Sequence, residues 1–366
     1  MIRVLVVEDS LTIRERLIEV ISEAEGFEVA GQAGDGERAV ELCRTLRPDV
    51  VTMDMVLPNC SGVEATERIM AFCPTPILIV SASTNRGELF QTYDALAAGA
   101  IDVLEKPRAD EVGWEQELLS TLRILSRVRV ITHPRARLAP AAKPAVPAGA
   151  ATGAAVSPGP ESVITPRSGS RPSSLPPRRL VAIGGSTGGP GALCGILSAL
   201  PKDFPLPILV VLHISKPFAA ALAEWLDSQT ALAVRYARHN EFLSELGPGQ
   251  VLLAPADEHL VVAGDRLQLT QEPPRYFCRP SVDVLFESIA ETAGGNAVGC
   301  LLTGMGRDGA KGLLEMRRSG SVTIAQDEAS SVVFGMAGEA VKLKAVGELL
   351  PIQHIAPRLA RLGRLP

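Results

Sequence analysis

Short apolar runs alternate with segments of helical periodicity in the first third of the chain. The runs lie at residues 2–7, 50–51, 77–80 and 101–104. After the first run, Ile13, Leu17 and Val20 recur at the spacing of one helix face, and further helical segments separate the other runs. A regular alternation of strand and helix is typical of β-α-β units, so this region is predicted to form a parallel sheet.

The last half of the chain repeats the same rhythm. Its strand-like runs lie at residues 180–183, 208–212, 251–253, 298–302 and 322–325, with helical segments such as 191–200 and 282–292 between them. No internal repeat relates the two halves. The pattern therefore predicts an α/β protein with two doubly wound parallel-sheet domains, at residues 1–125 and 178–366.

Residues 126–177 are predicted to form a disordered linker between these domains. Within them, residues 133–177 hold 10 prolines, 10 alanines, 4 glycines and 6 serines, which fill 30 of 45 positions. Such a stretch lacks the bulky apolar side chains that offset ordering entropy, so we expect an extended spacer. It also carries five basic residues against one acidic residue. A membrane or nucleic-acid contact is the alternative to a solvated spacer.

Composition narrows the class of protein. The 366 residues amount to about 2.4 domains of ordinary size. With 36 basic and 41 acidic residues the net charge is −5, and aromatic residues make up only 4%, so nucleic-acid binding is disfavoured. No apolar run approaches the ~20 residues of a membrane span, and Glu8 and Asp9 interrupt the first run too early for a signal peptide. The six cysteines form no Cys-x-x-Cys pair, which favours reduced thiols in the cytoplasm.

Polar residues stand where the strands of the first domain end. Glu8 and Asp9 follow the run at residues 2–7, Asp54 follows that at 50–51, Ser81 that at 77–80 and Lys106 that at 101–104. The carboxyl ends of parallel strands share one edge of a sheet. Three carboxylates there repel one another unless a hard cation such as Mg²⁺ lies among them. Any one of these residues alone reads as a solvated side chain. Together they predict a site for a transferred phosphoryl group with a carboxylate nucleophile.

In these residues the stretch 2–122 resembles the receiver domain of two-component response regulators. The resemblance implies that Asp54 is phosphorylated. It also implies two sets of ligands: Glu8, Asp9, Asp54 and the carbonyl of Val56 for Mg²⁺, and Ser81 and Lys106 for the phosphoryl group. The stretch departs from many receivers at Val103, where an aromatic residue is common.

A glycine-rich turn opens the second domain. Residues 184–190 read Gly-Gly-Ser-Thr-Gly-Gly-Pro and lie between a strand and a helical segment, which fits the Gly-x-Ser-x-Gly turn with Ser186 as the nucleophile. The following helix N-terminus offers free N–H groups to an oxyanion. No lysine completes a Walker A loop, and Ser186 replaces a glycine of the dinucleotide fingerprint. A purely structural glycine turn is the alternative.

A serine nucleophile needs a base and a residue that orients the base. Of five histidines, His213 alone follows a buried strand run, whereas His239 and His259 are expected in loops. Asp308 is the only carboxylate of the glycine-rich segment 303–309, which also follows a strand. The order Ser186, His213, Asp308 differs from that of the α/β-hydrolases, so we expect a triad arranged separately on its own sheet.

Five segments together resemble the catalytic domain of the CheB methylesterase family: Gly-Gly-Ser-Thr-Gly-Gly, Leu-His-Ile-Ser, Arg-Pro-Ser-Val-Asp at 279–283, Thr-Gly-Met-Gly-Arg-Asp-Gly and Ala-Gln-Asp-Glu-Ala-Ser at 325–330. The resemblance spans residues 178–350. It implies Ser186 as nucleophile, His213 as general base and acid and Asp308 as the orienting residue, with Thr187 and Met305 in the oxyanion hole. Gly185 departs from an alanine common in the family.

The resemblance implies a flavodoxin-like receiver joined to a Rossmann-like methylesterase domain. The expected activity is demethylation of glutamate methyl esters and deamidation of glutamines on chemoreceptors, controlled by phosphorylation from a chemotaxis-type histidine kinase. Mg²⁺ would serve the receiver, and the esterase reaction would need no cofactor. We expect a cytoplasmic monomer that neither binds nucleic acid nor inserts into membranes. A non-catalytic receptor-binding adaptor and the same chemistry in a non-chemotactic pathway are the alternatives.

Overall fold

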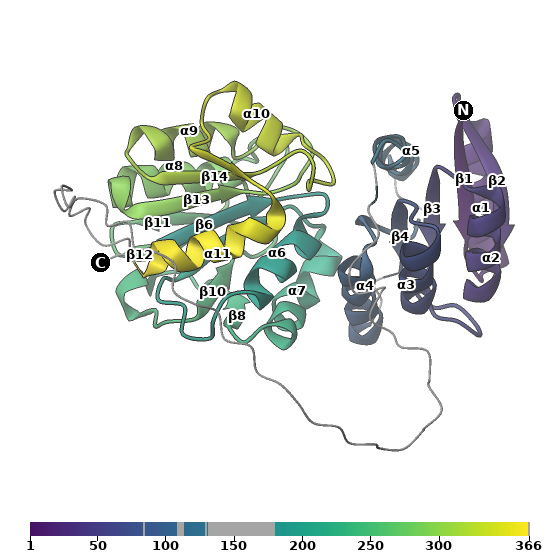
Figure 1. Cartoon of the computed structure of the whole chain (residues 1–366), viewed down its shortest axis with the longest axis horizontal. Coiled ribbons are helices and arrows are strands. Elements are labelled where there is room, and N and C mark those ends of the chain that lie inside the picture. The colour runs from purple at the N-terminus through teal and green to yellow at the C-terminus, as the bar shows by residue number, and fades with distance from the viewer. Residues whose placement is uncertain (83–84, 108–112, 129, 131–179, 365–366) are drawn as a thin grey trace, which may run out of the picture.

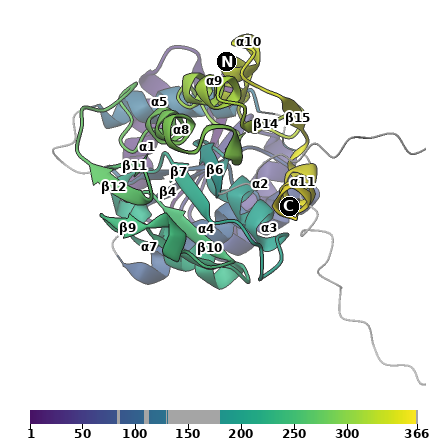
Figure 2. The same ribbon diagram turned by 90° about the vertical axis from the view of Figure 1, so that its left-hand side faces the viewer.

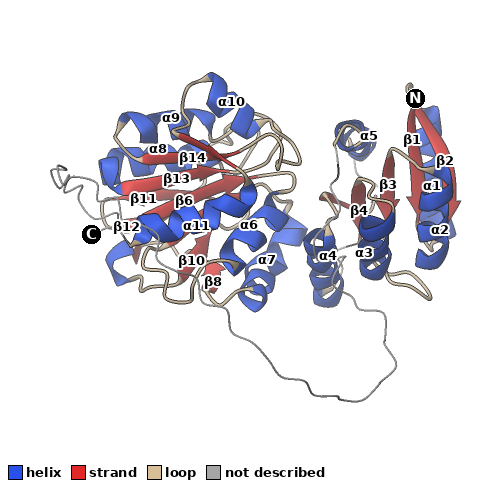
Figure 3. Cartoon of the chain, viewed as in Figure 1, coloured by secondary structure: helices blue, strands red, loops and turns tan. Residues whose placement is uncertain are grey.

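The computed structural model of the chain describes residues 1–82, 85–107, 113–128, 130 and 180–364. They form two parallel sheets flanked by helices and one small antiparallel sheet. The two parallel sheets lie at opposite ends of the longest axis (Figure 1), and Figure 3 shows helices on both faces of each. None of the helices in these ranges combines the length and apolar character needed to cross a bilayer. The predicted linker falls almost entirely outside the described residues.

The first sheet has five strands in the order β2-β1-β3-β4-β5, all parallel. This is the flavodoxin-like order that the sequence predicts. Its strands are β1 (Ile2–Val7), β2 (Phe27–Ala33), β3 (Val50–Met53), β4 (Ile77–Ser81) and β5 (Asp102–Glu105). Its helices are α1 (Leu11–Glu23), α2 (Gly36–Leu46), α3 (Gly62–Phe72), α4 (Arg86–Ala98) and α5 (Trp114–Leu125). The sequence pattern missed β2, because this edge strand contains Glu28 and Gln32 and has no continuous apolar run.

The start of α3 is fixed against the end of β3. Ser61 and Glu64 form a capping box that satisfies the first N–H groups of α3. A Cβ on Gly62 would stand 2.1 Å from the carbonyl oxygen of Asp54, so only glycine allows this approach. The backbone around Asp54 is therefore held from both sides, by β3 and by α3.

The second sheet has seven parallel strands in the order β15-β14-β13-β6-β7-β10-β8. Its strands are β6 (Leu180–Gly185), β7 (Ile208–Leu212), β8 (Ala233–Tyr236), β10 (Gln250–Leu253), β13 (Ala297–Leu301), β14 (Val322–Gln326) and β15 (Glu348–Leu350). The helices are α6 (Gly189–Ser198), α7 (Lys216–Gln229), α8 (Val282–Ala293), α9 (Ala310–Arg318), α10 (Met336–Lys342) and α11 (Ile352–Gly363).

The strand order reverses beside β6. The chain first adds β7, β8 and β10 on one side of β6 and then crosses to add β13, β14 and β15 on the other. All residues of β6, β7 and β13 are buried, which explains their continuous apolar runs. A reversal of this kind leaves a crevice at the carboxyl ends of the strands, where open α/β sheets bind their ligands.

A three-stranded antiparallel sheet accompanies the large one, and the sequence pattern missed it. It consists of β9 (Glu241–Phe242), β11 (His259–Ala263) and β12 (Arg266–Thr270), in the order β11-β12-β9. Gly264 and Asp265 form the two-residue turn between β11 and β12, with φ of 61° at Gly264. A Gly-Asp pair between two short apolar runs is a hairpin signal, so this sheet was readable from the sequence.

Helix α4 of the first domain packs on α6 and α7 of the second. Tyr93 and Trp225 stack with ring centroids 5.2 Å apart, and both side chains are fully buried. The Tyr93 hydroxyl donates to the carbonyl of Phe218 (2.7 Å), and the Trp225 indole donates to Asp94 (2.9 Å). Figure 2, which looks from the second domain toward the first, shows the helices of the two domains overlapping. The contact brings the first domain against the crevice of the second.

Candidate active site

Ser186 lies in the turn between β6 and α6, at the carboxyl edge of the large sheet. Its N–H donates to the carbonyl of Thr303 (3.1 Å), and its own carbonyl accepts from Gly189 N (2.6 Å). Gly188 has φ of 75°, and a Cβ there would stand 2.7 Å from Val332. The tight turn therefore requires glycine, as the motif predicts. It fixes the serine backbone at the start of α6.

His213 follows β7 and reaches the same edge. Its N–H donates to the carbonyl of Gly185 (3.0 Å), which ties it to the strand that carries Ser186. Its ring Nε2 lies 2.8 Å from Asp308 Oδ2, and the side chain is 15% exposed. The predicted base and its predicted orienting residue are thus in direct contact.

Asp308 is buried and saturated with hydrogen bonds. Besides His213, its carboxylate accepts from Val282 N (2.7 Å), Ser281 Oγ (2.8 Å), Asp283 N (3.0 Å) and Gly309 N (3.0 Å). Burial alone would raise the pKa of Asp308, but His213 and these donors hold it below its usual value. The aspartate is therefore ionised at neutral pH and accepts a hydrogen bond from the protonated Nε2 of His213.

The surroundings of His213 raise its pKa. Burial alone would lower the pKa of His213, but the hydrogen bonds to Asp308 and Cys278 raise it to about 9. Because Nε2 donates to Asp308, the neutral ring carries its free lone pair on Nδ1. Cys278 Sγ lies 3.6 Å from this Nδ1. The sequence pattern predicts only that Cys278 is one of six reduced thiols and does not place it in the site.

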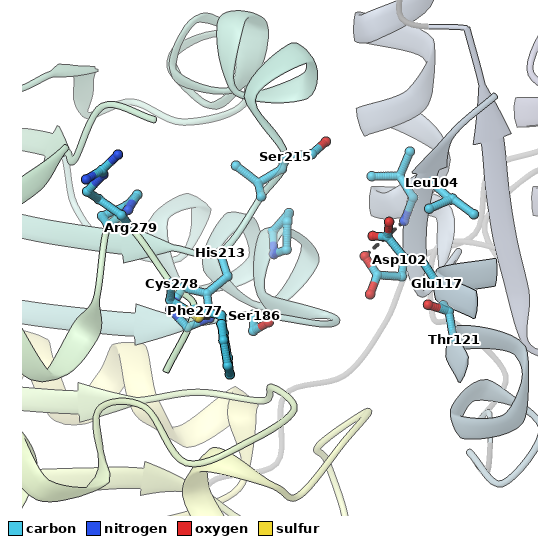
Figure 4. A pocket seen from close by; sticks show the side chains of 14 residues that line it. Asp102, Leu104, Glu117, Thr121, Ser186, His213, Ser215, Phe277, Cys278 and Arg279 are labelled. Atoms are coloured by element: carbon cyan, nitrogen blue, oxygen red, sulfur yellow. Dashed lines mark hydrogen bonds between the residues drawn. The ribbon is translucent and has the colours of Figure 1, made fainter. Parts of the chain in front are cut away.

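Ser186 and His213 line the same cavity, but no hydrogen bond joins them in the described part of the chain. Figure 4 shows Ser186, His213 and Cys278 close together on the side of the second domain. Hydrogen bonds between a nucleophile and its base are often long in ligand-free sites and tighten around a substrate. The three predicted residues are thus brought to one edge, with the serine–histidine contact still to form.

The cavity has a volume of about 330 Å³ and lies between the two domains. The second domain lines it with Ser186, Pro190, His213, Ile214, Ser215, Phe277, Cys278, Arg279 and Pro280, and the first domain with Asp102, Val103, Leu104, Glu117 and Thr121. Asp102 and Glu117 face the site across the gap in Figure 4. Burial raises the pKa of Asp102, against the opposing effect of a hydrogen bond to Thr187 and one to Val103 N (2.9 Å). The first domain thus presents a carboxylate to the residue that follows Ser186.

The two predicted oxyanion residues lie around Ser186. The carbonyl of Thr187 accepts from Thr303 Oγ1 (3.0 Å), which ties the serine turn to the end of β13. Gly304 precedes Met305, and a Cβ on Gly304 would stand 2.8 Å from Ser186 Cβ. The Met305 side chain is 52% exposed and does not contribute to the core. Its backbone N–H is the atom that the oxyanion hypothesis needs.

His259 lies on a strand beside the site, so the prediction that it lies in a loop is wrong. It begins β11 and is fully buried, because β11 and α8 pack together around it. Its Nδ1 accepts from Ser281 N (3.1 Å), and Ser281 in turn donates to Asp308. His259 therefore helps to position Ser281, which is one of the hydrogen-bond donors to Asp308. The hairpin signal at Gly264 would have placed it on a strand.

The first domain brings its predicted acidic residues together at the carboxyl edge of its own sheet. Ligand atoms of Glu8, Asp9 and Asp54 all lie within 4.8 Å of one another. Lys106 Nζ is 2.9 Å from Glu8 Oε2 and from Asp54 Oδ2. Burial and the Asp54 charge raise the pKa of Glu8 to about 7, although Lys106 opposes this. Burial also raises the pKa of Asp54.

This edge fits a hard divalent cation. Glu8 Oε2 and Asp54 Oδ2 are buried and accept no hydrogen bond, because Lys106 approaches them outside hydrogen-bonding geometry. Two buried carboxylate oxygens that form ion pairs with Lys106 but accept no hydrogen bond are suitable ligands for Mg²⁺. Val56 follows two residues after Asp54 and is half exposed, and Ser81 is buried at the end of β4. The carbonyl of Ser81 accepts from Lys106 N (2.9 Å), so both predicted phosphoryl contacts stand on neighbouring strands.

A phosphoacceptor-type edge in one domain and a serine–histidine–aspartate edge in the other describe a response regulator with an enzymatic output domain. Residues 4–114 match the model of the response regulator receiver domain, and residues 181–359 match that of the CheB methylesterase. The chain belongs to the CheB methylesterase family, and it is a methylesterase with a receiver domain.

The chain has relatives that match over almost its whole length. It is 42% identical to a protein-glutamate methylesterase/protein-glutamine glutaminase of Nitrosospira multiformis, and 43% identical to one of Anaeromyxobacter dehalogenans. Each match covers 99% of this chain and 97% of the relative. The solved CheB methylesterase catalytic domain of Thermotoga maritima is 36% identical, covers 50% of this chain and 98% of that one, and superposes with a TM-score of 0.48.

Proposed function

We propose that the chain hydrolyses γ-glutamyl methyl esters on chemoreceptors and deamidates receptor glutamines, as the names of its relatives describe for those proteins. The observation that carries this proposal is the pair of His213 and Asp308 at the edge that also bears Ser186. An imidazole held by an ionised aspartate beside a serine is the arrangement of an acyl-transfer catalyst. We place the reaction in the cytoplasm, where the six free thiols would stay reduced.

The residues suggest the following reaction. Ser186 Oγ attacks the ester carbonyl, and His213 Nδ1 takes the serine proton while Nε2 stays bonded to Asp308. Thr187 N–H and Met305 N–H stabilise the oxyanion, each worth about 10²–10³ in rate. The imidazolium then protonates the departing methanol, or ammonia from a glutamine. Water, deprotonated by His213, releases the acyl group as glutamate and restores Ser186.

We propose that phosphorylation of Asp54 controls this reaction. A chemotaxis-type histidine kinase would be the phosphodonor. Glu8, Asp9, Asp54 and the Val56 carbonyl would hold Mg²⁺, which screens the charge of the phosphoryl group, and Ser81 and Lys106 would contact that group. The first domain lines the esterase cavity, so its displacement would open the site to a receptor. We also propose that the chain acts as a monomer, because one chain contains both the acidic phosphoacceptor edge and the esterase residues.

The test is methanol release from methylated receptor, with and without a small-molecule phosphodonor and Mg²⁺. We expect Ser186→Ala to abolish release, and Asp54→Asn to keep the basal rate but lose the stimulation. Equal release by wild type and Ser186→Ala would favour a non-catalytic receptor-binding adaptor. Turnover of another methylated protein in place of chemoreceptors would favour a non-chemotactic pathway.

A further inference from the structure

We propose that Cys278 and His213 form a binding site for a thiophilic divalent cation, Zn²⁺ in the first instance, that reversibly switches the esterase off. The observation is the juxtaposition of a cysteine thiol with the free ring nitrogen of the base. His213, Cys278 and Asp308 place one ligand atom each within 4.8 Å of the others. The inhibitory effect, though not the metal site, rests on the function proposed above.

The distance between the two proposed ligands fits zinc. Cys278 Sγ and His213 Nδ1 lie 3.6 Å apart. In a tetrahedral site with Zn–S of about 2.3 Å and Zn–N of about 2.0 Å, the sulfur and nitrogen are separated by about 3.5 Å. A zinc ion can therefore bridge the two atoms in place of the thiol proton, without movement of either backbone. The thiolate and the neutral imidazole are ligand types that zinc prefers.

The histidine is already oriented as a metal ligand. In the neutral ring, which is the form that binds a metal, Nε2 donates to Asp308 Oδ2 at 2.8 Å and the lone pair is on Nδ1, 3.6 Å from Cys278 Sγ. Metal-binding histidines commonly donate their other ring N–H to a carboxylate in this way, which fixes the tautomer and raises basicity. Asp308 itself is occupied by four further donors. Its part is to orient His213 and not to bind the metal.

The cysteine is held in place by a strained turn. Arg275 and Cys278 exchange two backbone hydrogen bonds (3.1 and 2.9 Å) around Tyr276 and Phe277. Both central residues have positive φ, 50° and 65°, in a turn where Asn-Gly is the favoured pair. The Tyr276 ring is held beneath Arg307, whose guanidinium carbon lies 4.6 Å from the ring centroid. The turn thereby fixes the direction of Sγ, and pre-organised ligands favour metal binding.

The cavity supplies the space for the remaining ligands. Cys278 and His213 line it together with Ser186, and its volume of about 330 Å³ is large enough for several water molecules. A zinc ion on Nδ1 takes the lone pair that would accept the serine proton, so the general base is lost while the metal is bound. Mg²⁺ prefers oxygen ligands and does not compete for this thiolate. The cation needed for receiver phosphorylation therefore leaves this site free.

Metal binding is tested on the intact chain with Co²⁺, because a cobalt–thiolate bond gives a charge-transfer absorption that needs no enzyme activity. We expect one equivalent of Co²⁺ to produce this band and Zn²⁺ to remove it. Cys278→Ser should lose the band and weaken Zn²⁺ binding at least tenfold. Cys73→Ser, which removes a thiol of the first domain near Cys43, is the matched control and should keep both. A band that persists in Cys278→Ser, or no band in wild type, overturns the proposal.

Inhibition is then measured as methanol release, with each variant referred to its own metal-free rate. We expect Zn²⁺ to lower the wild-type rate more than tenfold, a chelator to restore it, and Cys278→Ser to require at least tenfold more Zn²⁺. Equal sensitivity of wild type and Cys278→Ser contradicts the inhibitory role. Ser186→Ala should keep the cobalt band without activity. If wild type also releases no methanol while the band depends on Cys278, the proposed function fails and the metal site stands.

Discussion

The ring of Tyr93 in the first domain stacks on that of Trp225 in the second, and the Tyr93 hydroxyl donates to the carbonyl of Phe218. This contact joins α4 to α7 and holds the first domain over the esterase cavity. If the covered site is the resting state, the contact must be lost before a receptor can enter. Its strength then sets the basal rate.

Tyr93→Phe tests this relationship with the smallest change. It keeps the stacked ring and removes one hydrogen bond, worth about 0.5–1.5 kcal/mol. We expect the unphosphorylated esterase rate to rise about two- to tenfold, and the further stimulation by phosphodonor to shrink. Tyr236→Phe removes a similar bond, to the carbonyl of Ala219 inside the second domain, and serves as the control with an unchanged basal rate. A basal rate that is the same in both variants would contradict this role of α4.

Asp102→Asn should lower the basal esterase rate, whereas Tyr93→Phe should raise it. Burial at the interface raises the pKa of Asp102, so its ionised form is less stable in the closed arrangement than in an open one. Asparagine can still accept from Val103 N and hydrogen-bond to Thr187 without the buried charge. We therefore expect a lower basal rate, with the phosphorylated rate nearly unchanged. Methanol release before and after phosphodonor addition measures both, and a higher basal rate would rule out this account.

The esterase should gain activity with rising pH. His213 must be neutral to accept the serine proton, and its pKa is raised to about 9. We expect kcat/KM to rise through neutral pH and level off near pH 9. The Cys278 contact contributes to the raised pKa, so Cys278→Ser should move this limb of the profile to lower pH. A limb near pH 6 in wild type would show that the Asp308 pair does not hold the proton as described.

Asp308→Asn tests whether Asp308 orients His213 for catalysis. Asparagine cannot accept all the hydrogen bonds of the carboxylate and favours the wrong His213 tautomer, and the equivalent change in a Ser-His-Asp enzyme costs about 10⁴ in kcat. We expect a loss of about 10²–10⁴ in kcat with little change in KM. The double variant with His213→Gln and Asp308→Asn should lose no more activity than His213→Gln alone, because the two residues act together. Additive losses in the double variant would contradict a shared role.

Asp283 offers a prediction on stability alone. It is fully buried, one oxygen has no hydrogen bond, and burial raises its pKa to about 6. A folded-state pKa above the unfolded value means that ionisation destabilises the fold as pH rises from about 4 to 6 and beyond. We expect Asp283→Asn to raise the free energy of unfolding by about 2–3 kcal/mol at pH 8 relative to its effect at pH 4. Denaturant titrations at the two pH values test this, and a pH-independent difference would refute it.

The sequence predicted the parts that follow from local pattern. The buried strands β6, β7 and β13 have continuous apolar runs, and Ser186, His213 and Asp308 follow them, so strand direction alone puts all three at one edge. β2 has mixed polarity, and its position comes from pairing with β1. Cys278 and Asp102 escaped prediction for a related reason. Cys278 contacts His213, which lies 65 positions away in the sequence, and Asp102 lines a cavity between the domains; neither arrangement leaves a local signature.

Strand β5 runs between the two sites. Asp102 at its first residue lines the esterase cavity, and Lys106 directly after its last residue contacts Glu8 and Asp54. Four residues of extended chain span about 13 Å, so a single short strand separates the phosphoryl-accepting edge from the wall of the other active site. We expect that a displacement of Lys106 toward a phosphoryl group on Asp54 would also move the backbone that carries Asp102. The phosphoacceptor edge and the wall of the esterase cavity are thus connected directly through the backbone of β5, with no helix between them.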